Sequence, residues 1–104
     1  MMPKTVKVAQ TSELAPGTGK VVAAEGRSIA LFNVEGTFHA LDNTCTHRGG
    51  PLGEGDLSGE IVTCPWHGAN FNVKTGAVTK PPAAAGVRSF PVKVEGNDVL
   101  VELD

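Results

Sequence analysis

Two short pairs of cysteine and histidine are the part of this sequence best suited to chemistry. The first pair is Cys45-Thr46-His47, and the second, after sixteen intervening residues, is Cys64-Pro65-Trp66-His67. Together they hold both cysteines of the 104-residue chain and two of its three histidines. Thiolate sulfur and imidazole nitrogen both bind transition metals, so the pattern indicates a metal centre.

Other interpretations of the four residues compete with this one. Buried cysteines act as small hydrophobic residues in many proteins, but both pairings would then be coincidence. A disulfide between the two cysteines leaves both histidines unexplained. Tetrahedral zinc uses the same ligand types, although zinc motifs usually pair Cys with Cys and His with His. A [2Fe–2S] cluster with two Cys on one iron and two His on the other suits mixed pairs, because each pair then supplies one ligand to each iron.

The residues around the two pairs resemble the Rieske iron–sulfur family, and the resemblance covers nearly the whole chain. The matching stretches are residues 38–43, 45–55, 64–68, 71–72, 76, 82 and 91–94. The resemblance implies that Cys45, His47, Cys64 and His67 hold one Rieske-type [2Fe–2S] cluster per chain. It also implies that the cysteines bind an inner iron, and that the histidines bind an outer iron from which the electron leaves.

Residues near the two pairs have family counterparts, and each also has a simpler explanation. Phe71 is expected beneath the cluster, where it also serves as an ordinary core residue. Pro81 and Pro82 resemble a proline loop that covers the cluster, or only connect strands. Trp66 either shields the cluster and meets a partner, or packs locally. His39 is expected to be a satisfied structural histidine rather than a ligand.

The spacer between the pairs carries Glu54, Asp56 and Glu60. These carboxylates either give an acidic character to the end of the protein that would dock to a redox partner, or they are solvated loop charges.

Features that respiratory Rieske proteins carry are missing here. Those proteins have two extra bridged cysteines, where this chain has Gly50 and Trp66. They also have a Ser and a Tyr that hydrogen-bond the cluster sulfurs, where this chain has Ala69 and Phe71. The chain is therefore more similar to low-potential Rieske ferredoxins that serve aromatic-ring dioxygenases.

Short apolar runs separated by turn residues predict an all-β fold. Strands are expected at residues 5–9, 20–24, 28–34, 37–41, 60–63, 70–73, 88–95 and 99–103, with a turn or one short helical turn at 11–14. Residues 80–86 are expected to form a loop, because prolines lack ladder donors. Residues 1–104 read as one domain, an antiparallel β-sandwich or barrel. The resemblance implies the Rieske fold, with a small cluster-binding subdomain inserted at about residues 43–72.

Composition excludes several classes of protein. The net charge is −2 and there is no basic run, so no nucleic-acid partner is expected. The N-terminal residues have no apolar signal core and nothing approaches a membrane span. We therefore expect a soluble, cytoplasmic protein.

The resemblance implies one-electron transfer, and a stand-alone enzyme is not expected because the sequence shows no nucleophile–base constellation and no mononuclear iron site. The resemblance implies a ferredoxin that takes electrons from an NAD(P)H-dependent flavoprotein reductase and passes them to a terminal oxygenase. One alternative is the small Rieske-like subunit of an NAD(P)H nitrite reductase. Another, of a different class, is a structural zinc module used for interaction.

Overall fold

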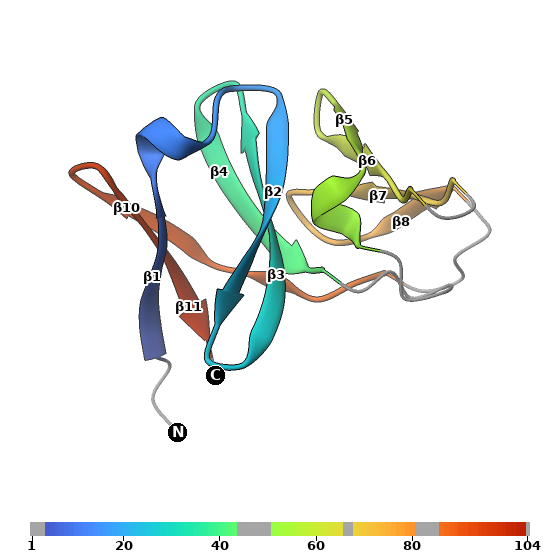
Figure 1. Ribbon diagram of the computed structural model, residues 1–104. Coiled ribbons are helices and arrows are strands. Elements are labelled where there is room, and N and C mark those ends of the chain that lie inside the picture. The colour runs from blue at the N-terminus through green and yellow to red at the C-terminus, as the bar shows by residue number, and fades with distance from the viewer. Residues whose placement is uncertain (1–3, 44–50, 66–67, 81–85, 104) are drawn as a thin grey trace.

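The protein folds into three antiparallel β-sheets, as a computed structural model shows (Figure 1). The structure describes residues 4–43, 51–65, 68–80 and 86–103. The first sheet has the order β1-β11-β10 and the second β2-β3-β4-β9, while the third, β5-β6-β7-β8, follows sequence order. The predicted all-β class is confirmed. No helix within the described residues is long and apolar enough to cross a membrane.

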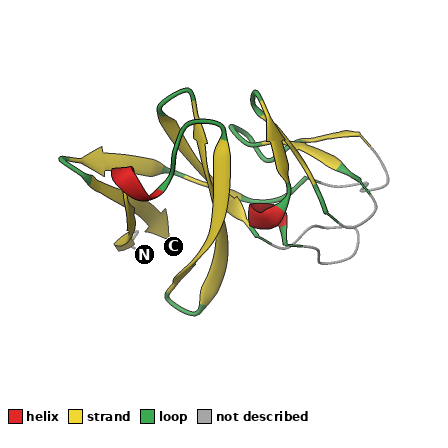
Figure 2. Ribbon diagram, turned by 45° about the horizontal axis from the view of Figure 1, so that its top comes forward, coloured by secondary structure: helices red, strands yellow, loops and turns green. Residues whose placement is uncertain are grey.

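Strands of the first two sheets come from both ends of the chain. Their bounds are β1 (Lys4–Gln10), β2 (Thr18–Ala24), β3 (Arg27–Val34), β4 (Thr37–Asp42), β9 (Ser89–Phe90), β10 (Val92–Glu95) and β11 (Asp98–Leu103), with one 3₁₀ turn, η1 (Thr11–Glu13). The third sheet lies between β4 and β9 in sequence: η2 (Leu52–Glu54), β5 (Asp56–Ser58), β6 (Ile61–Thr63), β7 (Asn70–Asn72) and β8 (Val78–Lys80). Figure 2 shows this third sheet beside the other two.

Strand β3 is the centre of the molecule because both of its faces are buried. Ile29 and Leu31 point into a core shared with the first sheet, whereas Ala30 and Phe32 point into a core shared with the third. All four side chains have an exposed fraction of 0%. The apolar run at 28–34 thus joins the two cores instead of alternating between core and solvent.

Tight hairpin turns join β2 to β3 and β3 to β4. Glu25 and Gly26 have φ of 51° and 77°, and Glu35 and Gly36 have φ of 52° and 93°. Positive φ at both central residues defines the type I′ turn that matches strand twist. The predicted hairpin across Glu35-Gly36 is confirmed.

The strand predicted at residues 88–95 is wrong as a single element. The structure divides it at Pro91 into β9, which pairs with β4, and β10, which pairs with β11. Pro91 has no N–H to donate to a ladder, so the chain changes sheets there. The closing hairpin itself is confirmed as β10 and β11.

Two short strands of the third sheet have no counterpart in the predicted elements. These are β5 and β8, each three residues long. Lys80, which was expected in a loop, ends β8 instead, and the rest of that expected loop at residues 81–85 lies outside the described residues. Because β8 completes the sheet, we propose that the inserted subdomain extends beyond the expected 43–72, to about residue 88.

Candidate metal centre

One of the four predicted ligands, Cys64, lies among the described residues. It directly follows β6, and 2% of its surface is exposed. Cys45, His47 and His67 lie outside the described residues, as do Trp66, Pro81 and Pro82. Within the described part of the chain, no group of three or more His, Cys, Asp or Glu side chains forms a metal site.

The second ligand loop is closed at its base by a backbone hydrogen bond. The Cys64 N–H donates to the Ala69 carbonyl at 2.8 Å. Below it the ladder continues, with Thr63 opposite Asn70 and Val62 opposite Phe71. The hairpin β6–β7 therefore holds both ends of the loop that contains His67.

The first ligand loop is closed in the same way. The Leu52 N–H donates to the Asn43 carbonyl at 2.8 Å. Asn43 follows β4 and Leu52 begins η2, so this bond spans the segment that contains Cys45 and His47. Both predicted ligand pairs thus belong to segments whose flanking residues are fixed in the fold.

Close backbone packing connects the two loop bases. A Cβ on Gly55 would collide with the carbonyl oxygen of Thr63, the residue before Cys64. A Cβ on Gly53 would lie 2.7 Å from Val21 Cγ2 and 2.9 Å from the Lys20 carbonyl. Only glycine permits approaches this close. The spacer therefore packs η2 against both β6 and β2.

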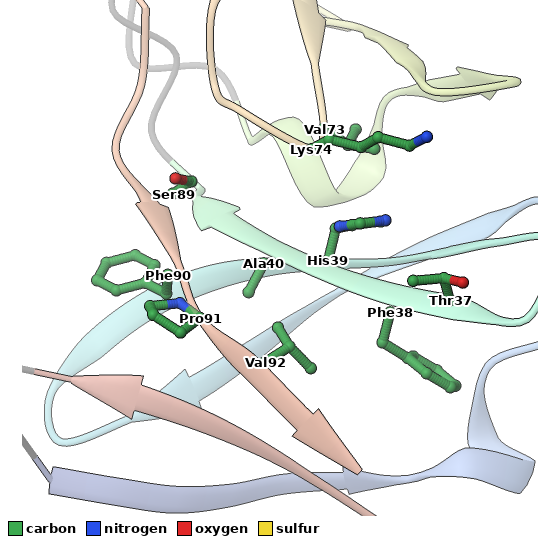
Figure 3. Close-up of a pocket in the computed structure, with 10 residues that line it drawn as sticks. All are labelled: Thr37, Phe38, His39, Ala40, Val73, Lys74, Ser89, Phe90, Pro91 and Val92. Carbon is green, nitrogen blue, oxygen red and sulfur yellow. The ribbon is translucent and has the colours of Figure 1, made fainter.

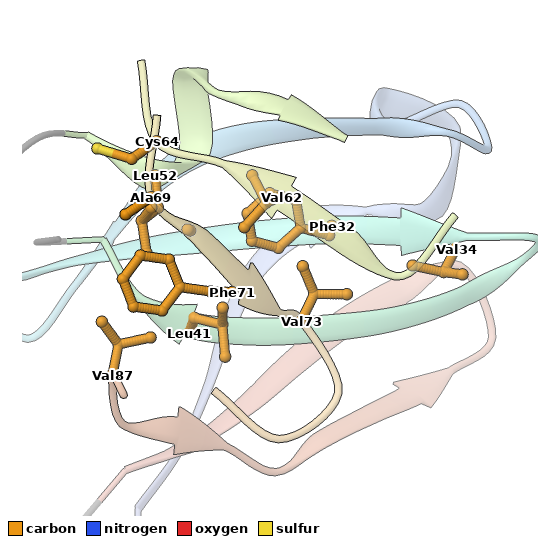
Figure 4. Packing of buried hydrophobic residues seen from close by; sticks show 11 residues of the cluster. Phe32, Val34, Leu41, Leu52, Val62, Cys64, Ala69, Phe71, Val73 and Val87 are labelled. Carbon is orange, nitrogen blue, oxygen red and sulfur yellow. The ribbon is translucent and has the colours of Figure 1, made fainter. Parts of the chain in front are cut away.

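An apolar cluster supports the loops. Leu52, Val62, Ala69 and Phe71 are each 0% exposed and share one core with Cys64. In Figure 4 the Cys64 sulfur lies at the edge of this core, on the side away from Val62. Phe71 fills the expected core position. Neither Ala69 nor Phe71 carries a hydroxyl, so neither side chain offers a sulfur a hydrogen bond.

The buried thiol fits the inner ligand of a cluster. A thiolate removed from water is stabilised by a cationic partner, and Cys64 is buried in an apolar core. Iron at this position would neutralise the thiolate. The donor set, the burial and the closed loops are therefore compatible with a [2Fe–2S] group.

His39 lies elsewhere, in a groove of about 410 Å³ that β4 forms with Val73, Lys74 and residues 89–92 (Figure 3). Its Nε2 is buried and has no hydrogen-bond partner among the residues that the structure describes. The prediction of a satisfied histidine is wrong for this atom. Burial and the Lys74 ammonium, in that order, lower the pKa of His39, while Glu60 acts in the opposite direction.

Glu60 lies at the opposite end of β6 from Cys64. It precedes β6, whereas Cys64 follows that strand. Its carboxylate is 3.1 Å from Lys74 Nζ and accepts a 2.9 Å hydrogen bond from Asn72 Nδ2. These two contacts lower the pKa of Glu60, Lys74 most strongly. This arrangement favours the interpretation of Glu60 as a solvated, paired charge.

Sequence reasoning did not identify the hydrogen bonds of Asn43 or the close packing of Gly55 as features of the site. Both belong to stretches that match the Rieske pattern, but composition alone gives a polar residue before a loop and a glycine within a spacer. Their contacts depend on which strands become neighbours. The sequence offers no direct signal of that packing.

Comparisons with known proteins agree with this geometry. Residues 4–91 match the family model described as the Rieske [2Fe-2S] domain. The chain is 38% identical over 97 residues to the biphenyl dioxygenase ferredoxin subunit of Pseudomonas sp. strain KKS102, covering 92% of this chain and 89% of that protein.

Solved structures give the same result. The ferredoxin of carbazole 1,9a-dioxygenase from Nocardioides aromaticivorans IC177 matches with a TM-score of 0.89 and 31% identity, over 97% of each chain. A chain of the complex of reduced oxygenase and oxidized ferredoxin in carbazole 1,9a-dioxygenase matches with a TM-score of 0.88 and 37% identity, over 93% of this chain and 91% of that one. The protein therefore belongs to the Rieske [2Fe-2S] domain family.

Proposed function

We propose that this protein is a one-electron carrier that delivers electrons to the terminal oxygenase of an aromatic-ring dioxygenase system. The observation that carries the proposal is the match, over nearly its full length, to ferredoxin components of such systems, including one from a complex with its oxygenase. The protein is not itself an enzyme. Its electron donor in this proposal is an NAD(P)H-dependent flavoprotein reductase.

The proposed cluster ligands are Cys45 and Cys64 on the inner iron, and His47 and His67 on the outer iron. Their order in the sequence supports the assignment, because each closed loop contributes one Cys and one His. When bound, such a cluster accepts and releases a single electron at a potential that its ligands and hydrogen bonds set. The protein's own residues hold the loops and exclude water from Cys64. Ala69 and Phe71 provide no hydroxyl group that could donate a hydrogen bond to a cluster sulfur.

Two alternatives remain distinct from this proposal. The small subunit of an NAD(P)H nitrite reductase would share the size and the fold. The carrier is favoured because the matching relatives are dioxygenase ferredoxins and because all four ligand residues are present in the sequence. A zinc module would be colourless, whereas a Rieske cluster absorbs visible light and gives an EPR signal when reduced.

Reconstituted turnover tests the proposal. NADH, a flavoprotein reductase and a ring-hydroxylating terminal oxygenase from the same gene neighbourhood are mixed with and without the protein. We expect substrate-dependent oxygen uptake only when the protein is present. Cys64→Ala, which removes a proposed ligand, is expected to lose both the visible spectrum and the activity. Full turnover without the protein, or with the Cys64→Ala variant, would contradict the proposal.

A further inference from the structure

Asn43 is one of two polar side chains that are buried within the described residues. Its exposed fraction is 8%, and the other residue, Asn33, is 4% exposed. Asn43 stands between the end of β4 and the first ligand loop. A buried amide is retained where its hydrogen bonds are made, so its partners indicate what it does.

Three hydrogen bonds tie Asn43 to two different layers. Its N–H donates to the Ser28 carbonyl on β3 at 3.2 Å, and its own carbonyl accepts the Leu52 N–H at 2.8 Å. The side-chain Oδ1 accepts the Gly53 N–H at 2.8 Å. The two backbone bonds would form with any residue at position 43, but the bond to Gly53 requires a side chain that places an oxygen acceptor where Asn43 Oδ1 lies.

Gly53 is a fixed point for that side-chain bond. It is buried, and its Cα packs too closely on Lys20 and Val21 of β2 to allow a side chain. Two residues later, Gly55 packs in the same way on Thr63, next to Cys64. A continuous set of contacts thus runs from Asn43 through η2 to Cys64.

We propose that Asn43 is a positioning residue that holds the first ligand loop in register with the second. By tying the residue before that loop to η2, it sets where Cys45 and His47 begin relative to Cys64. The inference rests on the proposed ligand assignment. It concerns retention and geometry of the cluster, and not the identity of the redox partners.

The test compares Asn43→Ala with Asn33→Ala in the cluster-loaded protein. Asn33 is a matched control because its Oδ1 also accepts a glycine N–H, that of Gly36 at 2.7 Å, but at the β3–β4 turn. Asn43→Ala removes the acceptor of the Gly53 N–H, whereas Asn33→Ala removes the acceptor of the Gly36 N–H and also the Nδ2 donor to the Leu14 carbonyl at 2.8 Å, so the control variant loses stability as well. The readouts are the half-time of cluster loss with an iron chelator, followed by visible absorbance, and the EPR line shape of the reduced protein.

We expect Asn43→Ala to lose its cluster roughly tenfold faster than wild type, because an unpaired buried N–H favours an opened loop by about that factor. Its EPR lines should broaden as loop positions vary. Asn33→Ala should keep the wild-type half-time and line shape. Asn43→Asp retains an oxygen acceptor at the same place and should recover most of the half-time.

Equal half-times for the two alanine variants would overturn the proposal, because loss of stability would then explain both. A wild-type half-time for Asn43→Ala would overturn it as well. If a variant takes up no cluster during expression, iron bound per chain after chemical reconstitution replaces the half-time. No redox partner is present, so the outcome is independent of whether the protein serves an oxygenase.

Discussion

Ala69 and Phe71 lie fully buried beside Cys64, and neither side chain carries a hydroxyl. A hydrogen bond to a cluster sulfur favours the reduced state, because that state is more negative. Two residues that fit the space and donate nothing therefore favour a low reduction potential. The electronic character of the site follows from these side chains as well as from the ligands.

Phe71→Tyr is expected to raise the reduction potential if the new hydroxyl reaches a sulfur, and Ala69→Ser should act in the same direction. A hydrogen bond to a charged acceptor contributes about 1.5–3 kcal/mol, which corresponds to roughly 60–130 mV for one electron. Protein-film voltammetry measures the shift. Phe32→Tyr is the control, since Phe32 is 0% exposed in the same core but on β3. Equal shifts in both tyrosine variants would refute a local effect of the hydroxyl.

His39 should make stability depend on pH. Burial and Lys74 lower its pKa in the folded state below the ordinary value of 6.5. The unfolded chain therefore takes up this proton first, and stability falls as pH decreases from about 6.5 toward the folded-state pKa.

In His39→Phe, the loss of thermal stability between pH 7.5 and 5.5 should be smaller than in wild type. Calorimetry of the cluster-loaded protein at both pH values measures it. Thr37→Val changes an exposed neighbour on β4 without removing a titrating group, so it should keep the wild-type pH dependence. An unchanged pH dependence in His39→Phe would show that His39 does not contribute.

At the scale of elements, η2 is the piece that joins the layers. It is three residues long, yet its flanking bonds reach Asn43, and the glycines at 53 and 55 touch β2 and β6. Such a contact tolerates no added atom where the opposing group is backbone, because backbone cannot rotate away.

Gly55→Ala should test this contact. The φ of Gly55 is −77°, so alanine suits the backbone, and the expected cost of about 1–3 kcal/mol comes from overpacking against Thr63. Gly59→Ala is the matched control in the β5–β6 turn, where a Cβ meets nothing but φ is +59°. That change costs about 1–2 kcal/mol from backbone strain alone.

Both variants should therefore unfold at lower temperature than wild type, but only Gly55→Ala should also lose its cluster faster. The reason is that the displaced Thr63 is bonded to Cys64. Thermal unfolding and visible absorbance measure the two properties on the same samples. Faster cluster loss in Gly59→Ala, or none in Gly55→Ala, would contradict the packing argument.

The elements that sequence could predict are those whose own residues specify them. The β3–β4 hairpin has an apolar run on each side of Glu35-Gly36, and both strands were predicted within one residue. Strands β5 and β8 are too short to show periodicity, so their pairing depends on β6 and β7. Predicting that the chain changes sheets at Pro91 would require knowing that β9 pairs with β4 and that β10 pairs with β11.

The same distinction holds for the candidate site. The types and spacing of the ligand residues determine which metal centre they can bind, so the cluster could be predicted from the two Cys/His pairs. The Asn43 bond to Gly53 and the burial of His39 Nε2 depend on tertiary packing. Nothing in a single sequence specifies such contacts.

At the scale of the whole molecule, the layers separate support from chemistry. Sheet β1-β11-β10 and the sheet β2-β3-β4-β9 form the support, and the third sheet lies beside them (Figure 1). The first loop closes between β4 and η2, and the second closes between β6 and β7 of the third sheet. Strand β3 joins the two cores, so the third sheet packs directly on the support. This division suits a carrier, in which a rigid fold holds one redox group.

The reduction potential of the wild-type protein tests the central claim most directly. Rieske centres span roughly −150 to +300 mV. A carrier that accepts electrons from a flavin and donates them to an oxygenase, with Ala69 and Phe71 beside its cluster, should lie at the low end, below about 0 mV. Protein-film voltammetry near neutral pH gives the value. A potential near the top of that range would contradict the proposed carrier function.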